Sequence, residues 1–156
     1  MPKMQHALIG VGVMLIDDTQ QVLLGKRIKY DESVTWCFPG GKVDEHESFE
    51  DAAVRELFEE TQLQLAAEQV QVFMLMNDIE RDYINLTAGV VCQLDSLQDD
   101  LKQSIRVTEP DIFECWQWFA LDTLPDNLFP ETQVMLDYWL NRHIAQNFKI
   151  HKISSI

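Results

Sequence analysis

The stretch over residues 40–63 constrains the fold of this chain more than any other. It reads GGKVDEHESFEDAAVRELFEETQL and holds eight acidic residues against one lysine and one arginine. Ser48, followed by Asp51 three positions on, predicts a helix start, because a serine hydroxyl can accept a hydrogen bond from a free amide of the first turn. We expect the helix to continue to about Thr61.

One face of the predicted helix carries carboxylates. Residues at i, i+3 and i+4 share a face of a helix, and these positions are Glu56, Glu59 and Glu60. Like charges at this spacing destabilise a helix by roughly a few tenths of a kcal/mol per pair. One interpretation is a bound Mg²⁺ or Mn²⁺, since these cations prefer hard oxygen ligands. The alternative is a solvated acidic face on which Arg55 forms local salt bridges.

The remaining helix positions predict an amphipathic segment. Ala52 and Ala53 are expected on the carboxylate face, where small side chains leave room for a metal and a phosphate. Val54, Leu57 and Phe58 are expected to point roughly the other way, toward a core. The helix is therefore predicted to have a metal-binding side and a core side.

Apolar and β-branched segments elsewhere predict a sheet. The expected strands cover residues 7–16, 22–24, 36–38, 70–76, 83–94 and 115–120. Residues 28–35 and 95–110 are predicted to be loops, a second amphipathic helix is expected over about 131–146, and the tail beyond it is not assigned. Together these elements predict one layered α/β sandwich.

Length and composition are typical of a globular protein. The 156 residues fit a single domain, with a core over about residues 7–146, and apolar and charged residues make up 46% and 24%. The longest apolar run is too short to span a bilayer, and the first residues lack the pattern of a secretory signal. Cys37, Cys92 and Cys115 are odd in number and widely spaced, which favours reduced thiols and a cytoplasmic location.

The formal net charge of −14 restricts the partners that the chain can bind. It repels the backbone of nucleic acid polymers and anionic membranes, so we expect neither as a partner. It also repels a nucleotide phosphate, so an anionic substrate would need a bound cation between itself and the protein. Taken alone, the charge is equally compatible with an acidic protein that is merely well solvated.

The acidic stretch resembles the Nudix box, whose pattern is G-x5-E-x7-R-E-U-x-E-E-x-G-U with U an aliphatic residue. The matching positions are Gly41, Glu47, Arg55, Glu56, Leu57, Glu59, Glu60 and Leu63. Gln62 stands where the family has a glycine that ends the helix with a left-handed backbone, so glutamine is expected to cost about 1 kcal/mol or to shift the cap. Further similarity over roughly residues 7–140 most resembles the MutT-like nucleoside triphosphate diphosphatases.

The resemblance implies a Nudix-type α/β/α sandwich, with a mixed sheet and flanking helices, and a Mg²⁺-dependent hydrolase. The implied metal ligands are the three helix carboxylates named above, with the backbone carbonyl of Gly40. Glu56 or Glu47 is the implied general base, and Arg55 is expected to orient neighbouring carboxylates through bidentate hydrogen bonds. The resemblance also allows a homodimer.

For each candidate residue outside the box, the sequence allows both a functional role and a purely structural one. Glu114 is a candidate extra metal ligand or a surface glutamate at a strand start. Lys26 and Arg27 are candidates for contacts with substrate phosphates, or are simply solvated. Trp36 and Phe119, among other aromatic residues, could stack on a base or pack in the core.

The function implied is hydrolysis of a nucleoside triphosphate, normal, modified or oxidised, to a nucleoside monophosphate and pyrophosphate. One alternative is a nucleotide-sugar or ADP-ribose pyrophosphatase. Another is a Nudix-fold module that senses a nucleotide without hydrolysing it. All box carboxylates are present, which favours an enzyme over a sensor.

Overall fold

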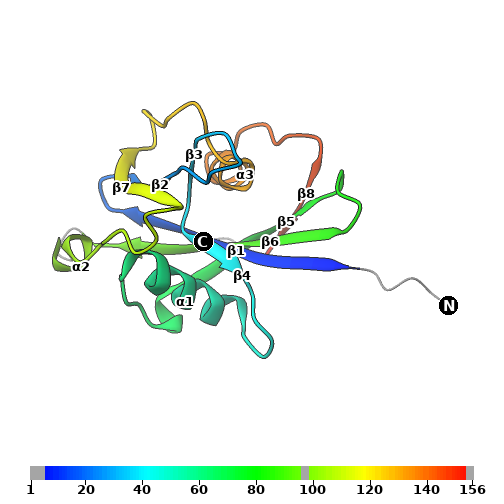
Figure 1. Cartoon of the computed structure of the whole chain (residues 1–156). Helices are drawn as coiled ribbons and strands as arrows, with labels where there is room; N and C mark the ends of the chain where they lie inside the picture. The colour runs from blue at the N-terminus through cyan, green and yellow to red at the C-terminus, as the bar shows by residue number, and fades with distance from the viewer. Residues whose placement is uncertain (1–5, 96–98, 154–156) are drawn as a thin grey trace.

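The computed structural model describes residues 6–95 and 99–153 and shows a mixed sheet of eight strands with helices on both faces (Figure 1). The strands are β1 (Ala7–Asp17), β2 (Gln21–Arg27), β3 (Thr35–Cys37), β4 (Gly40–Lys42), β5 (Gln71–Asp78), β6 (Ile84–Leu94), β7 (Phe113–Ala120) and β8 (Phe148–Lys152). The helices are α1 (Phe49–Thr61), α2 (Asp99–Gln103) and α3 (Pro130–Trp139), with a 3-10 turn η1 (Ala67–Gln69). This arrangement confirms the predicted α/β fold class.

The sheet is built around two long central strands. β1 and β6 pair in parallel along their whole lengths, from Ala7 opposite Ile84 to Asp17 opposite Leu94. The order across the sheet is β3-β2-β1-β6-β5-β8, with β4 paired to β1 and β7 paired to β2. All pairings other than β1 with β6 are antiparallel, so the sheet is mixed as expected.

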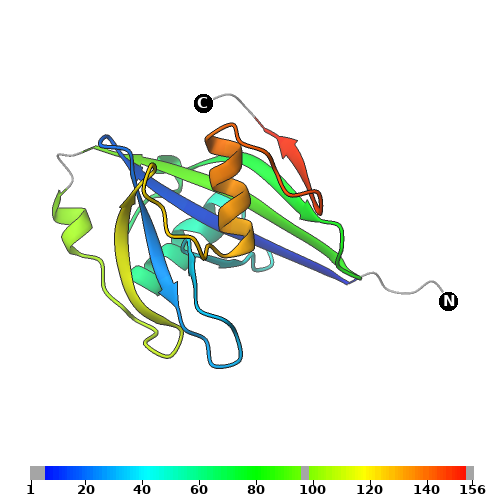
Figure 2. The same cartoon turned by 90° about the horizontal axis from the view of Figure 1, so that it is seen from above.

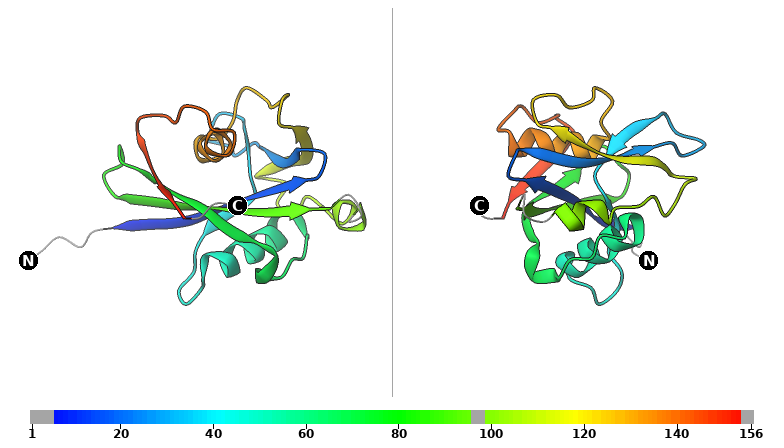
Figure 3. Two further views of the ribbon diagram at one scale, coloured as in Figure 1. Left: turned by 180° about the vertical axis from the view of Figure 1, so that it is seen from behind. Right: turned by 90° about the vertical axis from the view of Figure 1, so that its left-hand side faces the viewer.

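Each face of the sheet has its own apolar core. On one face, α1 packs through Ala52, Ala53 and Leu57 against residues such as Val13. On the other face, α3 packs through Val134, Met135 and Leu136 against a second cluster. Figure 3 shows the sheet between these two helices, and Figure 2 shows α3 lying across the strands.

A small residue in β1 lets α3 approach the sheet closely. A Cβ atom added to Gly12 would lie 2.8 Å from the sulfur of Met135, closer than nonbonded atoms approach. Gly10, two residues earlier, shares this face of the strand. A Cβ atom on Gly10 would lie 3.1 Å from the Gly41 carbonyl oxygen, and both glycines line the cavity described below.

Both ends of α1 follow from local sequence. Ser48 is the N-cap, and its hydroxyl accepts from the Asp51 amide at 3.0 Å, as predicted. At the other end, Gln62 adopts the left-handed conformation with φ 67°, and its backbone N–H donates to the Phe58 carbonyl. The helix therefore keeps the end that a glycine would give, with glutamine in a strained backbone region.

The predicted faces of α1 were wrong in two respects. Ala52 and Ala53 are fully buried in the core, so they do not line a metal site. Phe58 is 43% exposed, so it does not belong to the core. The reason is that the small side of the helix packs on the sheet, where alanines allow close approach of the backbones.

The C-terminal third also differs from expectation. The helix predicted over 131–146 ends at Trp139, because Leu140 caps it and Asn141 turns left-handed with φ 56°. The unassigned tail contains β8, an edge strand paired with β5. Within the predicted loop, the structure places α2; residues 96–98 of that loop lie outside the described residues. In the described part of the chain, no helix is long and apolar enough to cross a membrane.

Candidate active site

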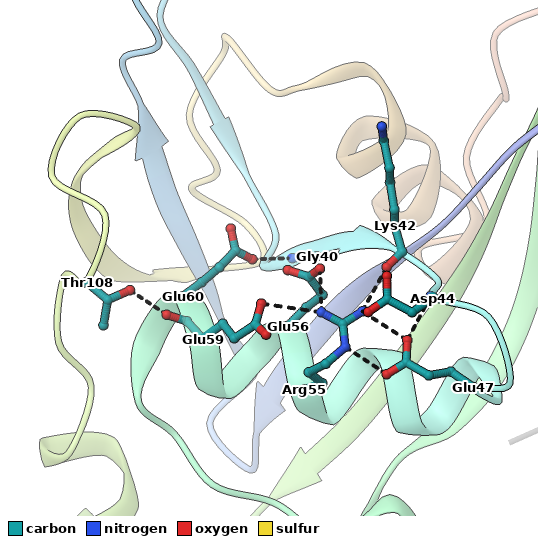
Figure 4. Close-up of polar contacts among 9 residues, drawn as sticks. All are labelled: Gly40, Lys42, Asp44, Glu47, Arg55, Glu56, Glu59, Glu60 and Thr108. Carbon is teal, nitrogen blue, oxygen red and sulfur yellow. Dashed lines mark hydrogen bonds and ion pairs between the residues drawn. The ribbon is translucent and has the colours of Figure 1, made fainter.

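Arg55 lies at the centre of the acidic side of α1 (Figure 4). Its Nε donates to Glu47 Oε2 at 2.7 Å and its Nη2 to Glu47 Oε1 at 3.0 Å. Nη1 donates to Glu56 at 2.9 Å and to Glu59 at 3.3 Å, and Nη2 also donates to the Lys42 carbonyl at 2.9 Å. One guanidinium thus fixes the three carboxylates and ties α1 to β4, as the planar fork of arginine permits.

The glycine pair that begins β4 lies directly against two of the carboxylates. The backbone N–H of Gly40 donates to Glu60 Oε1 at 2.7 Å. A Cβ atom on Gly41 would lie 2.4 Å from the carboxyl carbon of Glu56, so only glycine leaves the Glu56 carboxylate its present place. The Gly40-Gly41 pair therefore shapes the site through close backbone approach.

Two of the helix carboxylates carry perturbed pKa values. Burial raises the pKa of Glu60 to about 8, and the negative charges of Glu56 and Glu109 add to this effect against the Gly40 hydrogen bond. Burial also raises the pKa of Glu56, which the Arg55 hydrogen bond only partly offsets. Burial disfavours the charged form of these two carboxylates, and a nearby cation would stabilise that form.

Glu47 has a different environment from Glu56. The hydrogen bond from Arg55 and that from the Asp44 amide lower the pKa of Glu47. Both of its oxygens are held by donors, so the carboxylate is anchored on Arg55. This geometry suits a group that orients Arg55.

Glu59 lies at the exposed edge of the cluster. Its side chain is 53% exposed, and its backbone carbonyl accepts from the Thr108 hydroxyl of the segment that follows α2. The same segment carries Glu109, whose charge acts on Glu56 and Glu60. Residues far apart in sequence thus meet around the end of α1.

A cavity of about 380 Å³ opens beside Glu60. Its walls include Gly40, Gly41 and Lys42 next to the carboxylates. It extends between α3 and the face of β1 and β6. A small-molecule site in a protein commonly measures about 300–1,000 Å³, so the cavity is large enough for one.

Of the two residues predicted to contact phosphates, Arg27 lines the cavity and Lys26 does not. Arg27 lines the cavity, lies over the Phe129 ring at 5.3 Å and pairs with Glu32 at 2.8 Å. Lys26 instead pairs with Glu114 at 2.8 Å, on the paired strands β2 and β7. Glu114 is thus neutralised by Lys26 and does not contact the Arg55 cluster.

The two aromatic candidates pack on each other. The rings of Trp36 and Phe119 meet edge to face with centroids 4.9 Å apart, and both pack against the core on the α3 side. Neither lines the cavity beside Glu60. The structure therefore brings them together as packing residues.

The oxygen atoms of the acidic cluster are suitable ligands for a hard divalent cation. Carboxylate and carbonyl oxygens are the ligands that Mg²⁺ and Mn²⁺ prefer, and burial leaves Glu56 and Glu60 short of positive charge. Across residues 6–95 and 99–153, no three carboxylate, imidazole or thiolate groups are arranged as a finished metal site. Arg55 supplies the positive charge among these carboxylates in this structure.

Sequence reasoning missed two residues near the cluster. Glu109 is separated from the box by β5, β6 and α2, and only the fold brings its charge to act on Glu56 and Glu60. Lys42 lies within the box at a variable position, yet it lines the cavity.

Comparisons with known proteins identify the family of the chain. The family model described as NUDIX domain matches residues 6–139. An RNA pyrophosphohydrolase of Novosphingobium aromaticivorans is 30% identical over 135 residues, covering 77% of this chain and 81% of its own. A Bacillus subtilis protein that carries the provisional name 8-oxo-dGTP diphosphatase is 48% identical over 52 residues, or 33% of each chain.

Solved structures show the same fold. A MutT Nudix hydrolase from Burkholderia pseudomallei superimposes with a TM-score of 0.71 at 30% identity, covering 85% of this chain and 98% of that one. A MutT protein from Methanosarcina mazei gives 0.68 at 14% identity, covering 90% and 97%. The chain belongs to the Nudix hydrolase family. It is a pyrophosphohydrolase that acts on phosphoanhydride bonds, as its intact acidic box predicts.

Proposed function

We propose that this chain hydrolyses free nucleoside triphosphates to a nucleoside monophosphate and pyrophosphate, with Mg²⁺ as the physiological cation and Mn²⁺ as a substitute. One observation carries the proposal: a cavity large enough for a small molecule opens directly beside Glu60 and the Gly40-Gly41 pair of β4. A nucleoside in this cavity would direct its phosphates toward the carboxylates of α1. The similarity to MutT Nudix hydrolases supports it.

The residues of the chain divide into three roles in this proposal. Glu56, Glu59, Glu60 and the Gly40 carbonyl would hold the cation, and the charge of Glu109, from the segment after α2, acts on Glu56 and Glu60. The cation, when bound, neutralises charge on the phosphate oxygens and lowers the pKa of a coordinated water. Glu114 is a weaker candidate ligand, because Lys26 already pairs with it.

The second role is orientation. Arg55 orients Glu47 and Glu56 by hydrogen bonds, and Glu47 in turn orients the guanidinium because both of its oxygens accept from it. Glu56 is the better placed general base of the two, since Arg55 engages only one of its oxygens. The third role is phosphate binding, for which Arg27 and Lys42 are suited because both line the cavity.

A panel of nucleoside triphosphates with purified protein and Mg²⁺ tests the proposal. We expect release of pyrophosphate and of the corresponding monophosphate, identified by chromatography, and loss of turnover in the variant Glu59→Gln/Glu60→Gln with the fold retained by circular dichroism. Turnover of no triphosphate in the panel would remove the assignment. Release of inorganic phosphate in place of pyrophosphate would show that the enzyme cuts a different phosphoanhydride bond.

A second candidate is removal of pyrophosphate from an RNA 5′ end, favoured by similarity to RNA pyrophosphohydrolases over 77% of the chain. The net charge of −14 opposes it, because a polymer backbone brings many phosphates to an acidic surface. A short 5′-triphosphorylated RNA belongs in the same panel. Faster hydrolysis of this RNA than of any free triphosphate would favour the second candidate.

A further inference from the structure

The guanidinium of Arg27 already holds a carboxylate of this chain. Arg27 ends β2 and lines the cavity beside Glu60. Its Nε donates to Glu32 Oε2 at 2.8 Å, and its Nη2 donates to Glu32 Oε1 at 3.3 Å. A guanidinium binds a phosphate group through the same pair of parallel N–H donors. Glu32 therefore takes the place on Arg27 that a phosphate group of a ligand would take.

The ion pair between Arg27 and Glu32 is accessible to solvent. The Arg27 side chain is 21% exposed and the Glu32 side chain is 38% exposed. An ion pair at such a position is weak, because water solvates both partners well when they separate. A phosphate group in the cavity can therefore replace the carboxylate with little loss of stability.

The loop that carries Glu32, residues 28–34, joins β2 to β3. Hydrogen bonds to the Ile112 carbonyl and from the Asn127 side chain hold the two ends of the loop. Residues 29–34 are all exposed, and Figure 2 shows the loop extending beyond the ends of the two strands. Because the anchors lie at the ends, Glu32 can leave Arg27 without disturbing the sheet.

The charge of Glu32 neutralises Arg27 while the two are paired. The Arg27 hydrogen bond lowers the pKa of Glu32 against the effect of partial desolvation, and the charge of Lys29 in the same loop adds to this lowering. Glu32 is therefore ionised at neutral pH. Lys29 remains a neighbouring positive charge for Glu32 after it leaves Arg27, so the separated carboxylate is not isolated.

We propose that Glu32 competes with the phosphate groups of the substrate for Arg27 and thereby limits the affinity of the cavity for phosphates. The proposal rests on the proposed function, in which Arg27 binds phosphate, and adds the residue that sets the strength of this contact. The apparent affinity of a ligand is reduced by the fraction of the protein in which its site is free. The same factor acts on every phosphorylated ligand that contacts Arg27, so Glu32 raises the KM of the substrate and favours product release.

Binding of inorganic pyrophosphate in the presence of Mg²⁺, measured by isothermal titration calorimetry, tests the proposal without turnover. Glu32→Gln removes the charge and nearly keeps the shape, and we expect it to bind pyrophosphate about 3- to 5-fold more tightly than wild type. The KM for the best triphosphate should fall by a similar factor. Asp31→Asn is the matched control, because it removes the same charge from the neighbouring exposed position, and its affinity should stay within about twofold of wild type.

A double-mutant cycle connects the gain in affinity to Arg27. Arg27→Met should weaken pyrophosphate binding about 10-fold, because a charge-assisted contact is lost. In the Arg27→Met background, Glu32→Gln should change the affinity by less than about twofold, since the group for which Glu32 competes is absent. Thermal melts confirm that each variant is folded.

Four outcomes would overturn the proposal. Unchanged affinity in Glu32→Gln would show that the pair does not compete with phosphate, and weaker binding would show that Glu32 holds Arg27 in place for the ligand. A gain that persists in the Arg27→Met background would show a general effect of charge. Absence of pyrophosphate binding by wild type and Glu32→Gln alike would also reject it. Failure of the proposed function looks different: no triphosphate is hydrolysed, while Glu32→Gln still binds pyrophosphate more tightly through Arg27.

Discussion

Arg55 donates to both carboxylate oxygens of Glu47, at 2.7 and 3.0 Å, and this pair sets the geometry of the acidic cluster. The same guanidinium reaches Glu56 and Glu59. Because four acidic contacts share one cation, with Asp44 at 3.4 Å as the fourth, the carboxylates are held close together in spite of their repulsion.

Arg55→Lys should therefore reduce activity while leaving the fold intact. Lysine keeps the charge but cannot make the paired hydrogen bonds, so Glu47 and Glu56 lose their common anchor. We expect kcat for triphosphate hydrolysis to fall about 10- to 100-fold. Steady-state kinetics with circular dichroism measures this. Arg106→Lys is the control, because the Arg106 guanidinium donates to the backbone carbonyls of Gln103 and Ile105. An Arg55→Lys enzyme as active as that control contradicts the assigned role.

Gly41→Ala should affect catalysis more than stability. The new Cβ would lie 2.4 Å from the Glu56 carboxyl carbon, and the end of a flexible side chain can move away. We expect kcat to fall at least about 10-fold with a loss of less than about 1 kcal/mol in unfolding free energy.

Gly89→Ala is the control for Gly41→Ala and should reduce stability more than activity. Its Cβ would lie 2.7 Å from the sulfur of Met74, which is fully buried. The unfolding free energy should fall by about 1–3 kcal/mol, with normal kcat in the folded fraction. If the two variants show the same ratio of lost activity to lost stability, Gly41 has no special relation to Glu56.

Gln62→Gly should stabilise the protein. Gln62 holds φ 67°, a conformation that a side chain disfavours and that glycine adopts freely. The gain should be about 0.5–1 kcal/mol, smaller than the relief of strain because glycine also has more freedom in the unfolded chain. Urea denaturation measures it. Gln62→Ala retains a Cβ and should give no gain, so stabilisation by alanine as well would show that backbone strain is not the cause.

Asp17 should give a measurable pH dependence of stability. Burial alone raises the pKa of Asp17, but hydrogen bonds from Lys102, the Gln21 amide and Thr19 together outweigh it, so the pKa is lowered. A folded-state pKa below the unfolded value of 3.8 means that this contribution is present above that pH and is lost as the pH falls through the folded-state pKa.

Asp17→Asn tests this sign. We expect a loss of about 1–3 kcal/mol in unfolding free energy near neutral pH, and a smaller difference from wild type below about pH 4. Urea denaturation over pH 3–7, roughly spanning the Asp range, measures both. The neighbouring exposed Asp18 gives the control variant Asp18→Asn. A difference between wild type and Asp17→Asn that grows as the pH falls would contradict the account.

The elements with strong local signals were predictable from the sequence. Ser48 started α1 as expected, and segments rich in apolar and β-branched residues located the main strands. The end of α3 was not predictable, because the apolar spacing continues past Trp139 and the left-handed turn at Asn141 depends on where the chain must go next. β8 has few apolar residues and becomes a strand by pairing with β5.

Some residues of the candidate site were predictable from the sequence, and others were not. Glu47, Arg55 and Glu56 belong to one short continuous segment, and the resemblance to the Nudix box was enough to group them, while helical periodicity grouped Glu56 with Glu59 and Glu60. Glu109 and Asn85 reach the site from distant strands and loops, and their places depend on the sheet order. Trp36 and Phe119 illustrate the converse, since aromatic type alone did not distinguish stacking on a ligand from packing on each other.

The central claim is that the acidic face of α1 gathers a divalent cation beside the phosphates of a nucleotide. A crystal structure with Mg²⁺ and a non-hydrolysable nucleoside triphosphate measures this directly. The account predicts a cation bridging phosphate oxygens to the carboxylates of Glu56 and Glu60, with the base in the cavity between α3 and the sheet. A nucleotide bound with its phosphates away from these two carboxylates, and no cation between them, would contradict it.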